Sequence, residues 1–87
     1  MNVEFLEKFY KDLNKLQTPV KLAVAKVIEK IEKANSISDI QNIKKLSGHK
    51  SAYRIRIGDY RIGIFVTNHS LEFARVVHRK DIYDVFP

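Results

Sequence analysis

Hydrophobic residues in the first third of the chain recur every three or four positions, the spacing of one face of an α-helix. One series runs from Leu6 to Leu16, and a second follows Pro19 and continues to about Ala34. Thr18 is a candidate N-cap, and proline suits the first helical position because its missing N–H is harmless there. The sequence therefore predicts a helical hairpin. Its apolar stripes consist of Leu6, Phe9, Tyr10, Leu13, Leu16, Val20, Ala23, Val24, Val27, Ile28 and Ile31.

The period changes to two after Ala52, which is typical of β-strands. Three alternating runs follow, at residues 53–57, 60–66 and 71–77. Gly58 and Asp59 predict a two-residue turn between the first two runs. A second turn is expected over residues 67–70, with His69 as a turn residue.

Two further segments carry weaker signals. Val3 and Phe5 alternate with polar neighbours, which leaves room for a short strand at the N-terminus. Ser38 and Gln41 have the spacing of a capping box and predict a short helical turn ending at Lys44 or Lys45. We expect a single α+β domain over residues 1–87, with an N-terminal helical hairpin packed on a small antiparallel β-sheet.

The composition adds a basic character. The 87 residues carry a formal net charge of +6, which favours polyanions or an acidic protein as partners. All five arginines lie in the second half of the chain. Arginine is the residue best suited to planar, bidentate contacts with phosphate or carboxylate groups. The five arginines are Arg54, Arg56, Arg61, Arg75 and Arg79.

Other kinds of chemistry find little support. The chain has no cysteine, and its three histidines have no metal-ligand spacing, so no metal and no cofactor are expected. No apolar run approaches the length of a membrane span, and the N-terminus has no signal-peptide pattern. We therefore expect a cytoplasmic protein that does not bind membranes.

The two-residue turn has an electrostatic consequence. It places Arg56 opposite Arg61, and Arg54 opposite Gly63, whose missing side chain would leave a shallow space. Opposed like charges destabilise a sheet by up to about 1 kcal/mol. An anion bound between Arg56 and Arg61 would explain why the two arginines face each other despite their repulsion. The alternatives are that their stems shield apolar surface, or that acidic residues of the C-terminal tail neutralise them.

The direction of Arg75 depends on the second turn. A two-residue loop would place it on the helix side of the sheet, and a three-residue loop would place it beside Arg61. We expect the longer loop, because an uncompensated arginine against the helices is costly. Phe65 and Phe73 would then share the arginine face and, with Tyr83, could stack on unpaired RNA bases.

Two segments of the second half, KKLSGHKSAYRIRIGDYRIGIFV and FARVVHRKDIYDVF, together resemble the RelE/ParE superfamily of toxins from toxin–antitoxin pairs. The resemblance covers nearly the whole chain. It implies a helical hairpin followed by a strand pair that contains Tyr-Arg. In this superfamily RelE-like toxins cleave messenger RNA in the ribosomal A site, ParE-like toxins poison DNA gyrase, and some relatives have no known activity.

The resemblance also implies roles for individual residues. Catalytic positions would hold the scissile phosphate, assist attack by the 2′-hydroxyl and transfer protons. Arginine cannot be the base, because guanidinium stays protonated, which leaves Tyr83 or His78. The implied catalytic residues are Arg61, Arg79, Tyr83 and His78, and the implied RNA-binding residues are Arg54 and Arg56. We also predict that Arg75 and Lys45 bind RNA.

Three hypotheses for function follow. The first is a ribosome-dependent mRNA endonuclease that inhibits translation and is held inactive by an acidic or amphipathic segment of a cognate antitoxin. The second is a relative that acts by binding only, either a gyrase poison or a catalytically weak toxin. The third is a basic domain with no specific partner.

Overall fold

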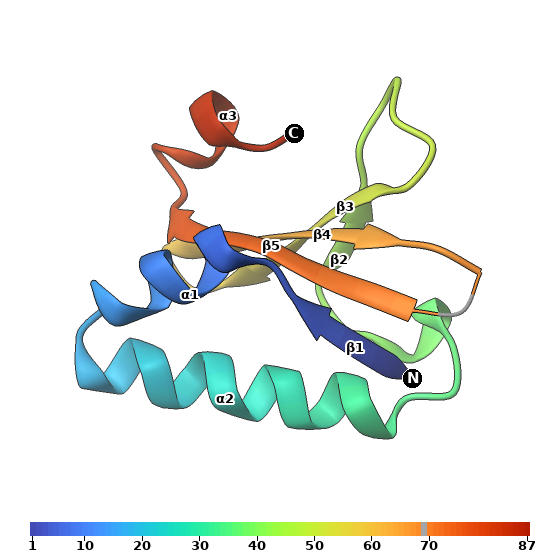
Figure 1. The fold of residues 1–87 in the computed structure, drawn as a ribbon, viewed down its shortest axis with the longest axis horizontal. Helices are drawn as coiled ribbons and strands as arrows, with labels where there is room; N and C mark the ends of the chain where they lie inside the picture. Colours follow the sequence, from blue (N-terminus) through green and yellow to red (C-terminus); the bar gives the residue numbers. More distant parts are fainter. Residues whose placement is uncertain (69) are drawn as a thin grey trace.

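The described part of the chain folds as five strands and three α-helices in an α+β arrangement, as predicted. In the computed structural model, residues 1–68 and 70–87 are described, so the turn position predicted for His69 lies outside them. The sheet order is β1-β5-β4-β3-β2, with α2 along one face and α3 on the opposite side (Figure 1). The elements are β1 (Asn2–Phe5), α1 (Glu7–Asn14), α2 (Thr18–Lys33), the 3₁₀ turn η1 (Ile37–Asp39), β2 (Ile43–Lys45), β3 (Ala52–Ile57), β4 (Tyr60–Val66), β5 (Ser70–His78) and α3 (Ile82–Val85).

The helical hairpin is confirmed, with one correction at its second helix. Helix α2 begins at Thr18, and its N-cap is Gln17 rather than Thr18. Pro19 lies in the first turn, where a backbone N–H has no intrahelical acceptor, so the missing N–H of proline costs no hydrogen bond. The helix therefore begins one residue earlier than the capping preference of threonine suggests.

The meander of β3, β4 and β5 is confirmed, and so is the turn at Gly58, which adopts φ +55°. The N-terminal strand is also present, but it runs parallel to β5, with Val3 beside Leu71. The sheet is thus antiparallel except at this edge.

The predicted helical turn up to Lys44 or Lys45 is wrong. The chain forms only the 3₁₀ turn η1, and Asn42 then adopts φ +61° and leads into β2. Ile43 pairs with Ile55 and packs against the main core. Packing of the partly buried Ile43 in strand β2 outweighs the capping-box pattern, because local propensity is a weak signal beside packing.

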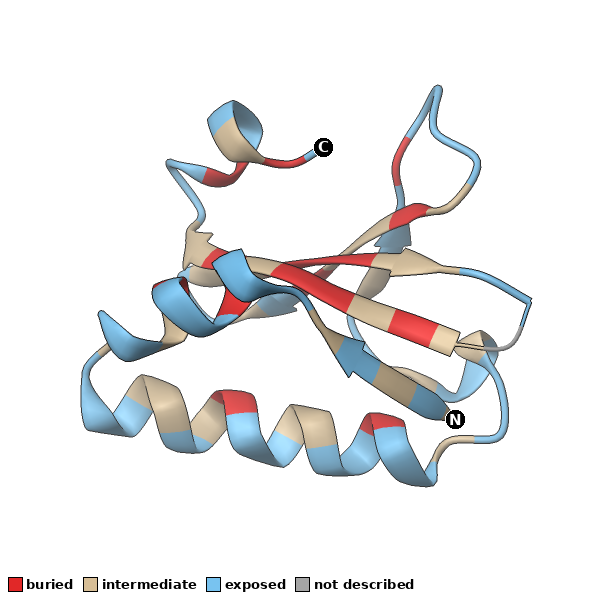
Figure 2. Ribbon diagram, viewed as in Figure 1, coloured by how far each residue is buried: buried red, intermediate tan, exposed pale blue. Residues whose placement is uncertain are grey.

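Apolar residues are buried on both faces of the sheet (Figure 2). The larger cluster lies beneath α1 and α2, and a smaller one lies beneath α3. The larger cluster contains Phe9, Val24, Ile31, Ile55, Ile62, Ile64, Leu71, Phe73 and Val76. The smaller contains Leu46, Ala52, Ala74, Ile82 and Phe86, with Phe65 packed against it.

Arg75 corrects the prediction for the second turn. The strands pair as Val66–Leu71 near that turn, and an irregularity beside Gly63 then shifts β5 by one residue. Arg75 reaches the carboxylate of Asp12 on α1, with its Nε 2.7 Å from Oδ2 and Nη2 3.0 Å from Oδ1. Beyond the irregularity Arg75 pairs with Gly63, which is the register that the longer loop predicts, but its side chain extends to Asp12 and does not join Arg61. The cost expected for an arginine near the helices is offset because Asp12 compensates the charge.

Phe73 also lies away from the arginine face. It is fully buried in the larger cluster and stacks on Phe5 at a centroid distance of 5.0 Å. Phe65 does share the arginine face, where it packs against Phe86. Phe73 precedes the irregularity in β5 and pairs with Ile64, so it lies on the helix face.

Asp12 is 7% exposed and accepts three hydrogen bonds, the third from the backbone N–H of Val76 at 3.0 Å. Hydrogen bonding to Asp12 raises the pKa of Arg75 above its ordinary value, although burial of the guanidinium opposes this. The carboxylate thus ties α1 to the irregular part of β5.

We expect Asp12→Ala to lower the free energy of unfolding by about 3 kcal/mol, because it leaves Arg75 and the Val76 N–H unpaired. Urea titration followed by circular dichroism measures this. The control is Glu7→Ala on the same helix, which removes only an exposed pair with Lys11 and should cost about 0.5 kcal/mol or less. Equal losses in the two variants would show that Asp12 contributes no more than a surface charge.

Candidate functional site

The candidate site is built on the hairpin of β3 and β4. Arg56 is directly opposite Arg61, as predicted. The amide of Arg56 donates to Asn42 on the β2 side, which makes the Arg56–Arg61 pair a non-hydrogen-bonded one, with Cα atoms about 4.5 Å apart. Nη1 of Arg61 donates to the carbonyls of Gly58 at 2.8 Å and Tyr60 at 2.9 Å. The guanidinium of Arg61 therefore lies over the turn.

Arg54 lies one position further along the same face. Its guanidinium carbon is 4.6 Å from the ring centroid of Tyr83, a cation–π contact that stabilises by about 0.5 to 2 kcal/mol. Its Nε is buried and has no hydrogen-bond partner among the described residues. A buried donor without a partner costs about 1 to 3 kcal/mol. The site thus retains an unsatisfied cationic donor.

These side chains surround a cavity of about 370 Å³, which we call the arginine cavity. None of its lining residues is acidic, so the acids of the C-terminal tail do not neutralise it. Four cations at one opening attract an anion, and three of them are arginines suited to planar contacts with phosphate oxygens. The lining residues are Asn42, Ile43, Lys44, Arg54, Arg56, Arg61 and Tyr83.

Helix α3 reaches this face because of Gly63 and Phe86. A Cβ on Gly63 would collide with the ring of Phe86, so the ring occupies the place of a side chain. The shallow space predicted above Gly63 is therefore filled. Phe86 and Ile82 are buried, while Tyr83 between them is 73% exposed. The packing of Phe86 thus holds Tyr83 over Arg54.

Arg79 lies at the same end of the sheet but does not line the arginine cavity. Its backbone N–H donates to the carbonyl of Asp59 at 2.7 Å, and its Nε is 3.6 Å from Oδ1 of Asp59. Both side chains are more than half exposed, so this ion pair contributes little to stability. Arg79 can exchange Asp59 for another anion at small cost.

His78 and Lys45 lie away from the arginine cavity. His78 is paired with Tyr60, on the face opposite to Arg61, and its ring meets that of Tyr60 at 74°. Lys45 is paired with Tyr53, while its neighbour Lys44 is paired with Arg54. Sequence reasoning missed Lys44 because the parity of β2 is visible only once that segment is known to be a strand.

The part of the chain that is described offers no metal site, since no three His, Cys, Asp or Glu side chains are grouped as ligands. Among the described helices, none is long and apolar enough to cross a membrane.

Comparison with known proteins places this geometry in a family. Residues 3–83 match the family described as ParE toxin of type II toxin–antitoxin system, parDE. Toxin RelE3 of Methanocaldococcus jannaschii is 43% identical over 88 residues, which cover 100% of both chains.

Two solved structures of toxin–antitoxin complexes contain a chain with a similar fold. A chain of the RelB–RelE antitoxin–toxin complex from Methanococcus jannaschii superposes with a TM-score of 0.83 at 40% identity, over 97% of this chain and 99% of that one. A chain of the intact Escherichia coli RelBE toxin–antitoxin complex gives 0.71 at 22% identity, over 88% and 94%. At that identity the likeness shows the fold alone.

We expect Gly63→Ala to displace Phe86 and release α3, because a methyl group and the ring cannot occupy the same place. Amide hydrogen exchange at residues 82–86 should then accelerate by at least tenfold. Gly58→Ala is the matched control, since its Cβ would meet nothing within 4 Å. That variant strains only the turn, at about 1 kcal/mol. Unchanged exchange in α3 of Gly63→Ala would contradict the packing argument.

Proposed function

The chain belongs to the ParE toxin family of type II toxin–antitoxin systems, and on this basis we propose that it is a ribosome-dependent mRNA endonuclease that inhibits translation. The observation that carries the proposal is the arginine cavity, in which Arg54, Arg56, Arg61 and Lys44 surround one opening beneath Tyr83. In this proposal the toxin acts in the cytoplasm on messenger RNA bound to ribosomes.

Binding of the scissile phosphate follows from the charges. Lysine and arginine side chains release counterions from RNA when they contact its phosphates, which supplies affinity without sequence preference. Arg56 and Arg61 face each other across the hairpin and can contact separate phosphate oxygens. Nε of Arg54 gains the partner that it lacks. The mutual repulsion of the arginines is then offset by the bound anion.

Cleavage by the neighbouring 2′-hydroxyl needs three contributions: a proton acceptor, stabilisation of a dianionic phosphorane, and a donor for the 5′-oxygen. The arginines supply the second, and Arg79 adds a cation when it leaves Asp59. Tyr83 is the titratable group at the opening of the cavity that can transfer a proton. The position of His78 on the opposite face gives it no direct part in this arrangement.

The partners in this proposal are the ribosome with its messenger RNA and a cognate antitoxin. Both solved structures compared above are toxin–antitoxin complexes. An acidic or amphipathic antitoxin segment would complement a toxin with net charge +6.

A second candidate function is binding without chemistry, as in a gyrase poison. The family description names ParE, and the arginine cavity offers one group, Tyr83, for proton transfer. Inhibition of gyrase supercoiling by the purified toxin, without messenger cleavage, would favour this candidate.

Arg61→Ala should lower messenger cleavage by about 100-fold or more, because removal of one transition-state donor costs this much. Primer extension on messenger RNA from a translating lysate measures cleavage in A-site codons, and growth after induction measures toxicity. Lys15→Ala, an exposed basic residue outside the cavity, is the control. Undiminished toxicity of a folded Arg61→Ala protein would overturn the assignment.

Tyr83→Phe separates stacking from proton transfer. The phenyl ring keeps the contact with Arg54, while the hydroxyl that could transfer a proton is lost. We expect RNA affinity within about twofold of wild type and cleavage lowered by about 100-fold, the lower range for general acid–base catalysis. Fluorescence titration with a short RNA and the primer-extension assay measure the two quantities. Cleavage at the wild-type rate would exclude the hydroxyl from the reaction.

A further inference from the structure

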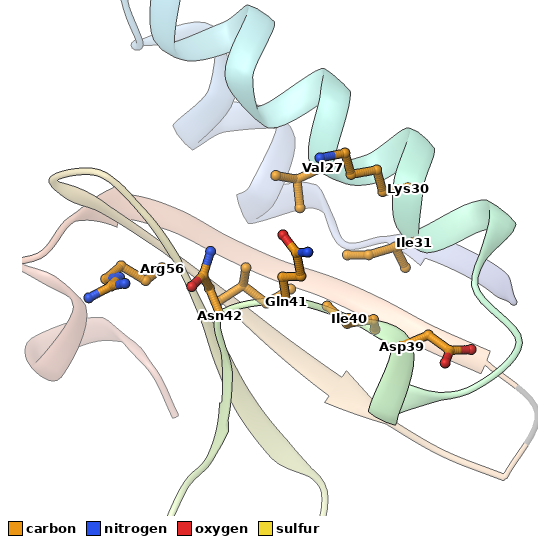
Figure 3. A pocket seen from close by; sticks show the side chains of 9 residues that line it. Val27, Lys30, Ile31, Asp39, Ile40, Gln41, Asn42 and Arg56 are labelled. Carbon is orange, nitrogen blue, oxygen red and sulfur yellow. The ribbon is translucent and has the colours of Figure 1, made fainter.

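A second cavity of about 270 Å³ lies on the other side of β3, between α2 and the segment that links η1 to β2. We call it the helix cavity. Val27 and Ile31 line it from α2, and Gln41 points toward α2 across the opening (Figure 3). Its remaining lining residues are Lys30, Asp39, Ile40, Asn42, Ile55 and Arg56.

The walls identify the class of occupant. Four aliphatic side chains line the cavity together with five polar or charged ones, and no aromatic ring on which a nucleobase could stack is among them. The volume is slightly below the range of about 300 to 1,000 Å³ that is usual for whole small-molecule ligands, and suits one or two aliphatic side chains. The amide groups of Gln41 and Asn42 at the rim can bond to a peptide backbone. The helix cavity therefore fits an aliphatic residue of a peptide segment.

The charges at the rim indicate the neighbours of that residue. Lys30 is exposed at one side, and Arg56 stands at the opposite end from Asp39, whose carboxylate points away (Figure 3). Lys26 and Lys33 extend the basic surface along α2, although Lys33 is paired with Glu29. Acidic residues beside the aliphatic one would complement these cations.

Arg56 connects the two cavities. It lines the helix cavity and also the arginine cavity. Its guanidinium points away from the helix cavity in Figure 3, and its side chain is exposed. An exposed arginine can adopt other rotamers, so a carboxylate at the rim of the helix cavity would compete with an anion in the arginine cavity for this guanidinium.

We propose that the helix cavity receives an aliphatic residue of the antitoxin, and that an acidic neighbour of this residue draws Arg56 out of the arginine cavity. The proposal rests on the proposed function in that it takes the antitoxin as partner. It explains inhibition without requiring the antitoxin to cover the whole arginine cavity. Antitoxin and RNA compete because they need the same guanidinium.

The test measures affinity of the full-length toxin for its cognate antitoxin by titration calorimetry. Gln41→Glu places a carboxylate at the rim with almost no change of shape, and should weaken binding by about tenfold through repulsion of the acidic segment. Gln17→Glu, an exposed position at the start of α2, is the matched control and should stay within twofold. Equal weakening by both variants would overturn the proposal.

Competition is measured with a short RNA whose 2′-hydroxyl at the cleavage position is replaced by hydrogen, so that no cleavage occurs. Saturating antitoxin should lower wild-type affinity for this RNA by at least tenfold. Simultaneous binding without loss of affinity would overturn the transfer of Arg56. Because these readouts are binding constants, they remain informative even if the toxin proves to lack nuclease activity.

Other occupants give different results. If RNA filled the helix cavity, Gln41→Glu would lower the affinity for the deoxy-substituted RNA and leave the affinity for the antitoxin unchanged. If a second copy of the chain filled it, the variant would change self-association in sedimentation velocity. Either result overturns the proposal.

Discussion

The carboxylate of Asp12 stabilises the bulge that sets the register of β5 beyond Phe73. Strand β1 covers β5 only as far as Phe73, so the edge of β5 is open beyond that residue. Asp12 accepts the N–H of Val76 and holds Arg75 there, and the strand continues one residue out of its earlier register. Every residue after this bulge occupies a different position from the one that an uninterrupted strand would give it. Asp12 therefore stabilises the bulge, and the bulge sets which face the C-terminal residues of β5 occupy.

The arginine face depends on the β3–β4 hairpin and on strand β2. The hairpin places Arg56 against Arg61, and Lys44 from β2 joins Arg54 on the same surface. Three observations separate this cluster from an ordinary solvated face: no carboxylate lines the cavity among the described residues, Nε of Arg54 is buried without a partner, and Tyr83 covers the guanidinium. Each of these raises the energy of the empty site or restricts its arginines. A bound anion lowers that energy, so the arrangement favours binding over stability.

The sequence predicts the regular parts of this fold and fails where long-range contacts decide. Periodicity locates both long helices and three strands, and Gly58 alone places Arg56 opposite Arg61, because a two-residue turn fixes the register of a hairpin. Strand β2 is not predicted, because its three residues are too few to show a period. The position of Lys44 therefore cannot be predicted either. The contact made by the Arg75 side chain is also not predicted, for a different reason. Its partner Asp12 is 63 residues away in the chain, and neither turn length nor alternation reports a bulge that such a contact stabilises.

The two halves of the site differ in how firmly they are held. The arginines project from a central hairpin whose strands are paired on both sides. Tyr83 belongs to a helix of four residues, which is far too short to be stable by itself. Its position depends on burial of Ile82 and Phe86, each of which contributes roughly 1.5 to 3 kcal/mol. Opening of α3 alone therefore requires less free energy than unfolding of the hairpin. A chain with α3 detached keeps the arginines of the hairpin and loses Tyr83, so under the proposed function binding of RNA would be separable from its cleavage.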